Sequence, residues 1–341
     1  MRLSVLDLVP VRAGQSSADA LAATIRLARL ADRLGYERYW LAEHHNMEAV
    51  AATNPPVLAA LVAASTERIR VGSGGVMLPN HAPLVVAEQF ALLEAYAPGR
   101  IDLGLGRAPG SDPVTSVLLR GGGAGSDAER FPEHVADILA LLDPRGTAFR
   151  LPNGEAYVVH ATPVARSMPT VWLLGSSDFS AQLAARMGLP YVFANHFGGE
   201  GLDRALELYR SGFQPSEYAD APVTILTANV VVADTADEAA AIARPALLSQ
   251  AKLFTAGRPQ PLATIEQAAA MTPTETEAPV VQRLATRWII DDGPGARARL
   301  AALAAQHGID EVMVSPTGGA HDGDPMDASP ARERAIELLA A

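Results

Sequence analysis

The chain of 341 residues contains no cysteine and a single lysine, Lys252. Without cysteine it has no disulfide, no thiolate metal ligand and no thiol nucleophile. An aldolase that works through a Schiff base needs a desolvated lysine at a barrel strand, and Lys252 follows a stretch with helical periodicity. Both absences therefore exclude whole classes of reaction before any motif is considered.

Long hydrophobic runs and an excess of positive charge are also missing. No apolar segment approaches the about 20 residues that span a bilayer. Asp7, Pro10 and Arg12 interrupt the N-terminal stretch, where a signal peptide needs a continuous apolar run. The net charge of −11 repels phosphate backbones. We therefore expect a cytoplasmic protein with neither a membrane nor a nucleic acid as a partner.

Short β-like runs alternate with longer helical patterns along the whole chain, which is typical of parallel βα units. Residues 147–159 predict an inserted hairpin, and residues 252–292 predict a long, partly helical insertion after strand seven. We expect one (β/α)₈ TIM-barrel domain over residues 1–341. Its eight strands are predicted at Leu3–Val9, Tyr39–Ala42, Ile69–Val76, Ile101–Leu105, Thr170–Leu174, Tyr191–Ala194, Val223–Ala233 and Glu311–Val314.

Polar or glycine-rich segments follow five consecutive predicted strands. The carboxyl ends of parallel strands open onto one face, where the chemistry of such folds collects. We therefore expect these segments to meet at one rim of the barrel. In chain order they are Glu43-His44-His45-Asn46, Gly72-Ser73-Gly74-Gly75, Gly104-Leu105-Gly106-Arg107, Gly175-Ser176-Ser177-Asp178 and Asn195-His196-Phe197.

Each segment has a structural and a functional interpretation. Gly175-Ser176-Ser177 is either a helix N-cap or an anion site at a helix N-terminus. Arg107 is either a surface ion pair or a fixed charge for the same anion. Glycines after a buried strand, as at Gly74-Gly75, often mark the close approach of a ligand. His44 suits proton transfer at neutral pH but is equally compatible with packing.

The chain resembles the bacterial-luciferase-like flavin monooxygenases. Within that family it is more similar to a subgroup of uncharacterised oxidoreductases than to true luciferases. The resemblance covers nearly the whole length and depends on four motifs in this order on successive strands. They are Tyr39-Trp40-Leu41-Ala42-Glu43-His44-His45, Val71-Gly72-Ser73-Gly74-Gly75-Val76-Met77-Leu78-Pro79, Gly99-Arg100-Ile101-Asp102-Leu103-Gly104-Leu105-Gly106-Arg107 and Leu173-Leu174-Gly175-Ser176-Ser177-Asp178.

The resemblance implies an FMN-binding enzyme whose reduced cofactor forms a C4a-peroxyflavin with O₂ and oxygenates a small organic substrate. A separate flavin reductase would supply reduced FMN, and the 252–292 insertion would act as a lid. It also implies a homodimer through the helices after strands two and three. His44 is the implied acid/base beside Glu43. The implied cofactor contacts are a non-prolyl cis peptide at Gly74-Gly75, the phosphate ligand Arg107 and the phosphate loop Gly175-Ser176-Ser177, with Arg120 or Arg130 as a second phosphate ligand.

The sequence departs from true luciferases at Gly106, which stands where their reactive cysteine lies, so we do not expect light emission. Three alternatives remain open. The same barrel could hold a deazaflavin-dependent dehydrogenase, or a flavin-binding protein without catalysis. A metal hydrolase that uses His44, His45 and His196 would need a His-x-His on strand one, where the chain has Leu6-Asp7-Leu8.

Overall fold

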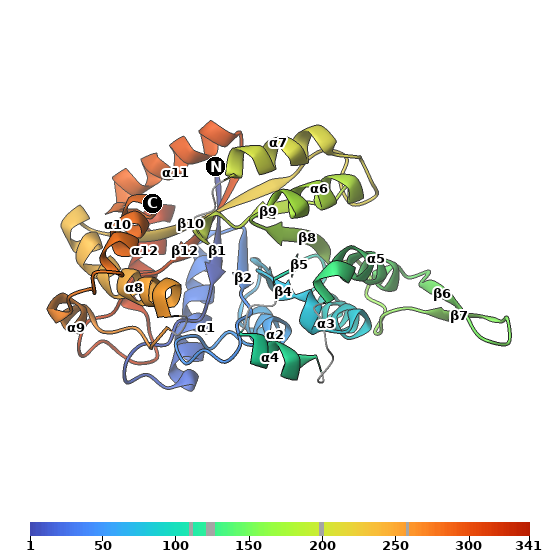
Figure 1. Ribbon diagram of the computed structural model, residues 1–341, viewed down its shortest axis with the longest axis horizontal. Coiled ribbons are helices and arrows are strands. Elements are labelled where there is room, and N and C mark those ends of the chain that lie inside the picture. The colour runs from blue at the N-terminus through green and yellow to red at the C-terminus, as the bar shows by residue number, and fades with distance from the viewer. Residues whose placement is uncertain (109–111, 121–126, 198–200, 257–258) are drawn as a thin grey trace.

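The fold is a closed barrel of eight parallel strands surrounded by helices (Figure 1). The structure, a computed structural model, describes residues 1–108, 112–120, 127–197, 201–256 and 259–341. The sheet closes because β10 pairs with β9 at one side and with β12 at the other, and β12 pairs with β1. Around the barrel the strands are β1 (Arg2–Asp7), β2 (Arg38–Leu41), β3 (Arg70–Ser73), β5 (Ile101–Gly106), β8 (Thr170–Gly175), β9 (Tyr191–Phe193), β10 (Thr224–Ala233) and β12 (Glu311–Pro316). The TIM-barrel prediction is confirmed, and the eight predicted strands correspond in order to these eight.

Helices cover the outside of the barrel, and their buried faces pack on the strands. Helix α1 shows how the sequence specifies such an element: Ser16 and Asp19 form a capping box, and Gly35 ends the helix with a φ of 80° that glycine adopts without strain. The helices are α1 (Ser17–Leu34), α2 (Pro55–Ser65), α3 (Pro83–Tyr96), α4 (Pro113–Leu119), α5 (Phe131–Leu142), α6 (Asp178–Met187), α7 (Leu202–Gly212), α8 (Ala236–Ala256), α9 (Ile265–Ala270), α10 (Ala278–Arg287), α11 (Gly293–His307) and α12 (Pro330–Ala340), with 3-10 turns η1 (Leu78–Asn80), η2 (Asp127–Arg130) and η3 (Asn195–Phe197).

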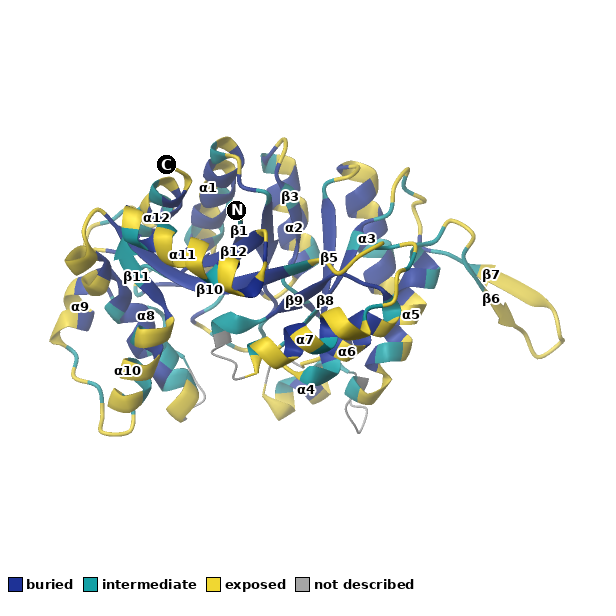
Figure 2. Ribbon diagram, turned by 90° about the horizontal axis from the view of Figure 1, so that it is seen from above, coloured by how far each residue is buried: buried dark blue, intermediate teal, exposed yellow. Residues whose placement is uncertain are grey.

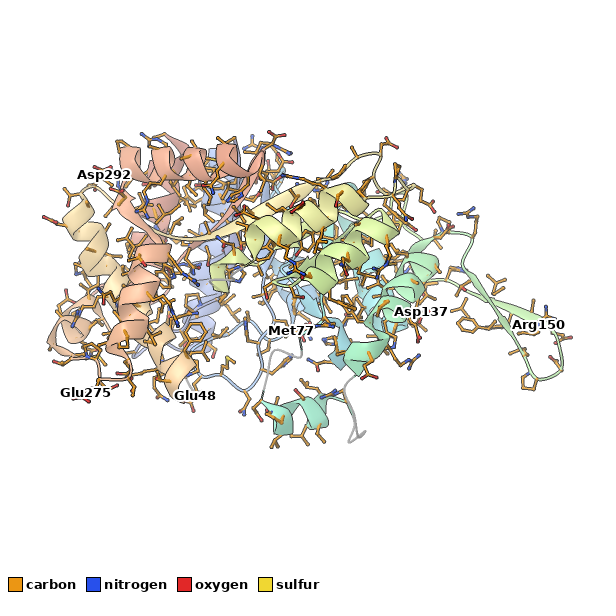
Figure 3. The ribbon with its side chains drawn as sticks, turned by 45° about the horizontal axis from the view of Figure 1, so that its top comes forward. Glu48, Met77, Asp137, Arg150, Glu275 and Asp292 are labelled. Atoms are coloured by element: carbon orange, nitrogen blue, oxygen red, sulfur yellow. The ribbon has the colours of Figure 1, made fainter. Side chains whose placement is uncertain are left out.

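Four short strands of the described residues lie outside the eight. The antiparallel pair β6 (Thr147–Arg150) and β7 (Ala156–Val159) is the predicted hairpin. It projects from the barrel as an arm (Figure 1), and Arg150 lies far from the body of the molecule (Figure 3). Strand β4 (Val76–Met77) pairs with β5. Strand β11 (Ile289–Asp292) pairs in parallel with β10, and neither its existence nor helix α4 was predicted.

The insertion after β10 is more ordered than the sequence indicated. Helix α8 runs on to Ala256, so Lys252 lies inside this helix and not after it. Helices α9 and α10 pack on α8, and the insertion ends in β11. Residues 257 and 258 lie outside the described part of the chain.

Polar side chains close the amino-terminal end of the barrel. Asp102 accepts hydrogen bonds from Arg38 (Nη1–Oδ2, 2.7 Å), Arg70 (Nη2–Oδ1, 2.6 Å) and the indole of Trp40 (Nε1–Oδ2, 3.0 Å). Glu311 accepts from Arg38 as well (Nε–Oε1, 2.6 Å). Above this network, Trp40 and another indole, Trp172, pack edge to face at 5.5 Å between ring centroids and fill the interior, while the eight barrel strands are mostly buried (Figure 2).

Candidate functional site

All eight residues singled out from the sequence line one cavity at the carboxyl-terminal end of the barrel. We call it the rim cavity, and its volume is about 1000 Å³ including its open mouth. The predicted residues are Glu43, His44, Gly74, Gly75, Arg107, Gly175, Ser176 and Ser177. Further walls come from Leu8, Ala42, Met77, Gly106, Ala108, Leu174, Ser180, Ala194 and His196.

The glycine pair in the wall is required by the packing behind it. The peptide bond between Gly74 and Gly75 is cis, as the resemblance implied. A Cβ atom on Gly74 would lie 2.6 Å from Leu6 Cδ1, and one on Gly75 would lie 2.8 Å from the carbonyl oxygen of Gly104. Both distances are too short for a side chain, so this part of the wall is bare backbone.

The anion-binding features predicted at one end of the cavity are brought together. Ser177 is the N-cap of α6, yet its side chain makes no capping hydrogen bond. The Arg107 guanidinium lies 4.2 Å from the ring centroid of Phe179, in the first turn of the same helix. Among the described residues, no carboxylate pairs with Arg107, so the surface ion pair considered from the sequence is absent there. Arg120 and Arg130 do not line the cavity, and Arg130 pairs with Glu133.

Glu43 is held by two histidines and a backbone N–H. Its Oε1 atom lies 2.8 Å from both His45 Nε2 and His81 Nε2, and Oε2 accepts a 2.9 Å hydrogen bond from the N–H of Met77, a residue near the middle of the molecule (Figure 3). Burial alone would raise the pKa of Glu43, but these hydrogen bonds outweigh burial and lower the pKa to about 2. Glu43 is therefore a carboxylate that fixes the rim.

The role of His81 was missed by sequence reasoning. It follows η1 directly, in the segment Pro79-Asn80-His81-Ala82-Pro83. A histidine between two prolines, just after the glycine-rich end of β3, was the available signal. The hydrogen bonds described for Glu43 run to His45, His81 and Met77, and none of them runs to His44.

His44 and His196 form the inner wall of the cavity. Burial lowers the pKa of His44, and the nearby charge of Glu43 only partly opposes this. The Nδ1 atom of His44 is buried, and none of the described residues forms a hydrogen bond with it. Burial also lowers the pKa of His196, to about 3, and its Nδ1 lies 2.8 Å from Thr227 Oγ1. Both imidazoles are therefore neutral at neutral pH.

A second cavity lies on the other side of these two imidazoles. We call it the side cavity, and its volume is about 900 Å³ including its mouth. It shares Leu8, His44 and His196 with the rim cavity and extends toward α8 and the insertion. Within the described ranges, no group of three or more histidine, aspartate or glutamate side chains is arranged to hold a metal ion. In the same part of the chain, no helix is long and apolar enough to cross a membrane.

Comparison with known proteins assigns the family. The model of the luciferase-like monooxygenase family matches residues 1–298. A luciferase-like monooxygenase of Escherichia coli K12 is 42% identical over 315 residues, which cover 92% of this chain and 90% of that protein. The chain therefore belongs to the luciferase-like monooxygenase family, whose members are flavin-dependent enzymes.

Solved structures agree with the fold. The crystal structure of apo-MsnO8 is 33% identical, with a TM-score of 0.86 over 99% of this chain and 97% of the other. The oxygenating constituent of 3,6-diketocamphane monooxygenase from Pseudomonas putida, solved with FMN, has a TM-score of 0.72 at 18% identity and covers 100% and 97%. An F420-dependent secondary alcohol dehydrogenase shares the fold at 15% identity, with a TM-score of 0.63 and coverage of 99% and 98%. Relatives on this barrel thus bind FMN or F420.

Proposed function

We propose that this chain is the oxygenating component of a monooxygenase that uses reduced FMN and O₂ to oxygenate a small organic substrate. The observation that carries the proposal is the set of polar groups around the rim cavity that have no hydrogen-bond or ion-pair partner among the described residues: Arg107, the N-terminus of α6 and the buried Nδ1 of His44. Reduced FMN supplies two electrons, so that one atom of O₂ enters the substrate and the other leaves as water. The chain's own residues would bind and orient the cofactor and shield the reacting atoms from water.

The donors at α6 fit a phosphate group. The N–H groups of the first helical turn lack partners within the helix, and the positive end of the helix dipole favours an anion. The hydroxyl of Ser177, which makes no capping bond, and that of its neighbour Ser176 add two donors. Stacking on Phe179 orients the Arg107 guanidinium and is itself stabilising by roughly 0.5–1 kcal/mol at an exposed site. We propose these residues as the FMN phosphate site.

The remaining wall fits a flat aromatic ring. The backbone of Gly74 and Gly75 offers a surface without side chains, against which a ring can lie. His44, neutral and with Nδ1 unpartnered, can accept or pass on a proton at the edge of that ring. Glu43 positions this wall through His45 and His81, and it does not itself move a proton at neutral pH because its pKa is about 2.

A separate flavin reductase is part of this proposal. The P. putida relative is named as the oxygenating constituent of its monooxygenase, which is how a protein that works with a second component is described. We also propose that the chain works in the cytoplasm, in the same compartment as the reductase, because reduced FMN has to pass from the reductase to this chain.

We further propose a homodimer through α2 and α3. These helices expose large apolar side chains on their outer faces: Val57, Leu61, Leu84, Val85, Leu92 and Tyr96. Exposed apolar side chains that gather on one face mark contacts between proteins. Leu61→Glu and Leu92→Glu would shift the chain to a monomer in light scattering, whereas Leu118→Glu, an exposed leucine on α4, would leave the mass unchanged.

The insertion over residues 252–292 is proposed as a lid within a single domain spanning residues 1–341. Leu253, Pro259, Leu262 and Trp288 from this segment line the side cavity. A wall contributed by an insertion can exclude water from the reacting atoms when it closes.

Titration with reduced FMN in the absence of oxygen tests the cofactor proposal. Wild-type protein would bind saturably, and Arg107→Ala would weaken binding at least tenfold, because a charge-assisted hydrogen bond contributes about 1.5–3 kcal/mol. Arg145→Ala, which removes an exposed arginine paired with Asp143, is the matched control and would bind normally. If reduced FMN fails to bind, the same titration with reduced F420 decides whether the site takes the deazaflavin.

A pulse of oxygen after the titration tests the reaction itself. Bound reduced FMN would be oxidised, and an added substrate would gain one oxygen atom. His44→Gln would retain FMN binding but lose turnover by about 100-fold or more, the usual contribution of a positioned acid or base. Unchanged turnover in this variant would remove His44 from the mechanism and favour a protein that only carries flavin.

A further inference from the structure

The side cavity begins where the rim cavity ends. Both cavities are lined by Leu8, His44 and His196, so a molecule in the side cavity lies against the same two imidazoles as a ligand in the rim cavity. The side cavity is also lined by Ser249, Gln250 and Leu253 of α8, and by residues of the insertion. A second compartment that meets the cofactor compartment at the proposed proton-transfer group is positioned to hold a reacting partner.

The described residues that line the side cavity offer no uncompensated charge. Most of its lining is apolar, from Met47 at one side to Leu253 and Trp288 at the other. The one arginine in its lining, Arg332, is 4% exposed, and its guanidinium binds Asp7 (Nη2–Oδ1, 2.5 Å) and the carbonyl oxygen of Pro316 (2.9 Å). The Arg332 guanidinium lowers the pKa of Asp7 although burial opposes this, so the pair is ionised and neutral overall.

A charged substrate would lose its hydration in this compartment without gaining a counter-ion. Such a transfer costs several kcal/mol even after relaxation. His44 and His196 cannot compensate, since both have lowered pKa values and carry no charge at neutral pH. The compartment therefore selects against ions, and the apolar lining favours a molecule that buries hydrocarbon surface.

Gln250 is an uncharged polar residue of the lining whose hydrogen-bonding capacity is available. The side chain of Gln250 lines the cavity, and among the described residues nothing hydrogen-bonds to its amide. Asn229, at the other side, donates its amide hydrogen to the carbonyl oxygen of His196 (2.9 Å). A free amide in an apolar wall can recognise one neutral acceptor or donor, as sites with a few polar groups do.

We propose that the side cavity is the substrate compartment and that it takes an uncharged, largely apolar molecule. Gln250 recognises one neutral group on that molecule by a hydrogen bond. The inference rests on the proposed function, because the rim cavity has to hold the flavin for the side cavity to hold the substrate. For a sulfide as substrate, the reaction is sulfide + O₂ + FMNH₂ → sulfoxide + FMN + H₂O. Without substrate, FMNH₂ + O₂ → FMN + H₂O₂.

Three matched probes test the selection. They are methyl phenyl sulfide, 4-(methylthio)benzoate and 4-(methylthio)acetophenone, which share one framework and differ by a carboxylate or a neutral ketone. Binding to the FMN-loaded protein is measured by calorimetry, and sulfoxide and H₂O₂ are measured after reduction and an oxygen pulse. We expect the two neutral probes to bind and the carboxylate to bind at least tenfold more weakly. Equal binding of the carboxylate, or no binding of either neutral probe, overturns the inference.

Two variants locate the compartment. Leu253→Trp would fill the side cavity and lower neutral-probe binding and sulfoxide yield at least tenfold, while FMN affinity and H₂O₂ formation stay within about twofold. Phe254→Trp, at the next residue of α8 and 48% exposed, is the control and would change neither. If Leu253→Trp leaves sulfoxide formation intact, the substrate lies elsewhere. Loss of FMN binding or of H₂O₂ formation in the wild-type protein would instead contradict the proposed function itself.

Gln250→Met tests the specificity residue, because it keeps the size of the side chain and removes its hydrogen bond. The wild-type protein would bind the ketone about 3- to 10-fold more tightly than methyl phenyl sulfide, which corresponds to one neutral hydrogen bond. The variant would lose this preference and keep its affinity for methyl phenyl sulfide. An unchanged preference would show that another group reads the ketone.

Discussion

The amino-terminal and carboxyl-terminal ends of the barrel carry polar side chains in very different states of pairing. At the amino-terminal end, Asp102 and Glu311 satisfy two arginines and the Trp40 indole in one buried network. At the carboxyl-terminal end, the Ser177 side chain makes no capping hydrogen bond, and the Nδ1 of His44 has no partner among the described residues. One set of strands thus supports a closed end and an open end.

This difference separates stability from function within one fold. Buried polar groups that have partners hold the strands in register, and breaking them leaves charges without compensation. Polar groups without partners cost free energy in the folded protein and are kept where a ligand completes them. The comparison predicts that substitutions at the two ends have opposite consequences.

The largest expected effect is at the closed end. Asp102→Asn would keep the shape of the side chain but leave Arg38 and Arg70 without their shared carboxylate. Breaking a buried ion pair in this way costs about 3–5 kcal/mol, which urea unfolding would measure. If the variant unfolds at the wild-type urea concentration, the network does not stabilise the barrel and the contrast between the two ends fails.

At the open end, His44→Leu would have the reverse outcome. It removes a buried nitrogen that has no partner, so the free energy of unfolding would stay the same or rise by about 1 kcal/mol. Turnover would fall by about 100-fold or more. Urea unfolding checks the stability of this variant, and the turnover assay checks its activity. A large loss of stability would show that His44 is a structural residue.

The sequence predicted the barrel and the contents of its rim because both depend on local order. Strands with polar ends follow one another along the chain, and parallel pairing alone brings those ends together, which is why Arg107 and Ser176 could be placed beside one cavity before the structure was known. The hairpin and the capping box at Ser16 are equally local.

The closed end could not be predicted in the same way. Asp102 lies 64 residues from Arg38, and Glu311 lies 273 residues from it, and no periodic pattern connects such positions. The partners of Glu43 were missed for a related reason: His81 reaches it from a turn after the strand. Strand β11 was missed because it follows a segment rich in proline and threonine. Residues 289–292 form a strand because they pair with β10.

The dependence of stability on pH sharpens the comparison further. The folded protein keeps His196 neutral down to a pKa of about 3, whereas histidine in the unfolded chain is protonated below about 6.5. The contribution of His196 to the free energy of unfolding is therefore fully present above pH 6.5. It falls as the pH drops toward 3, by at most about 1.4 kcal/mol per pH unit for one proton. Glu43 adds a separate loss between about 4.5 and 2, because its pKa is lowered in the folded state.

Two variants assign these pH windows. His196→Gln would reduce the loss of stability between pH 6.5 and 4.5. Glu43→Gln would reduce the loss of stability only below about pH 4.5. Urea unfolding at a series of pH values checks both. Parallel curves for all three proteins would mean that the rim does not titrate with folding and that acid sensitivity arises elsewhere.

The smallest expected effect compares two serines that occupy the same position of a helix. Ser16 caps α1 and accepts a hydrogen bond from the N–H of Asp19, whereas Ser177 caps α6 without such a bond. Ser16→Ala would cost about 1 kcal/mol of stability and leave FMN affinity unchanged. Ser177→Ala would change stability by less than about 0.5 kcal/mol and weaken FMN binding about 2- to 10-fold, the contribution of one neutral hydrogen bond. If Ser177→Ala behaves like Ser16→Ala in both assays, the end of α6 is an ordinary cap, and the phosphate of the flavin must be held mainly by Arg107 and Ser176.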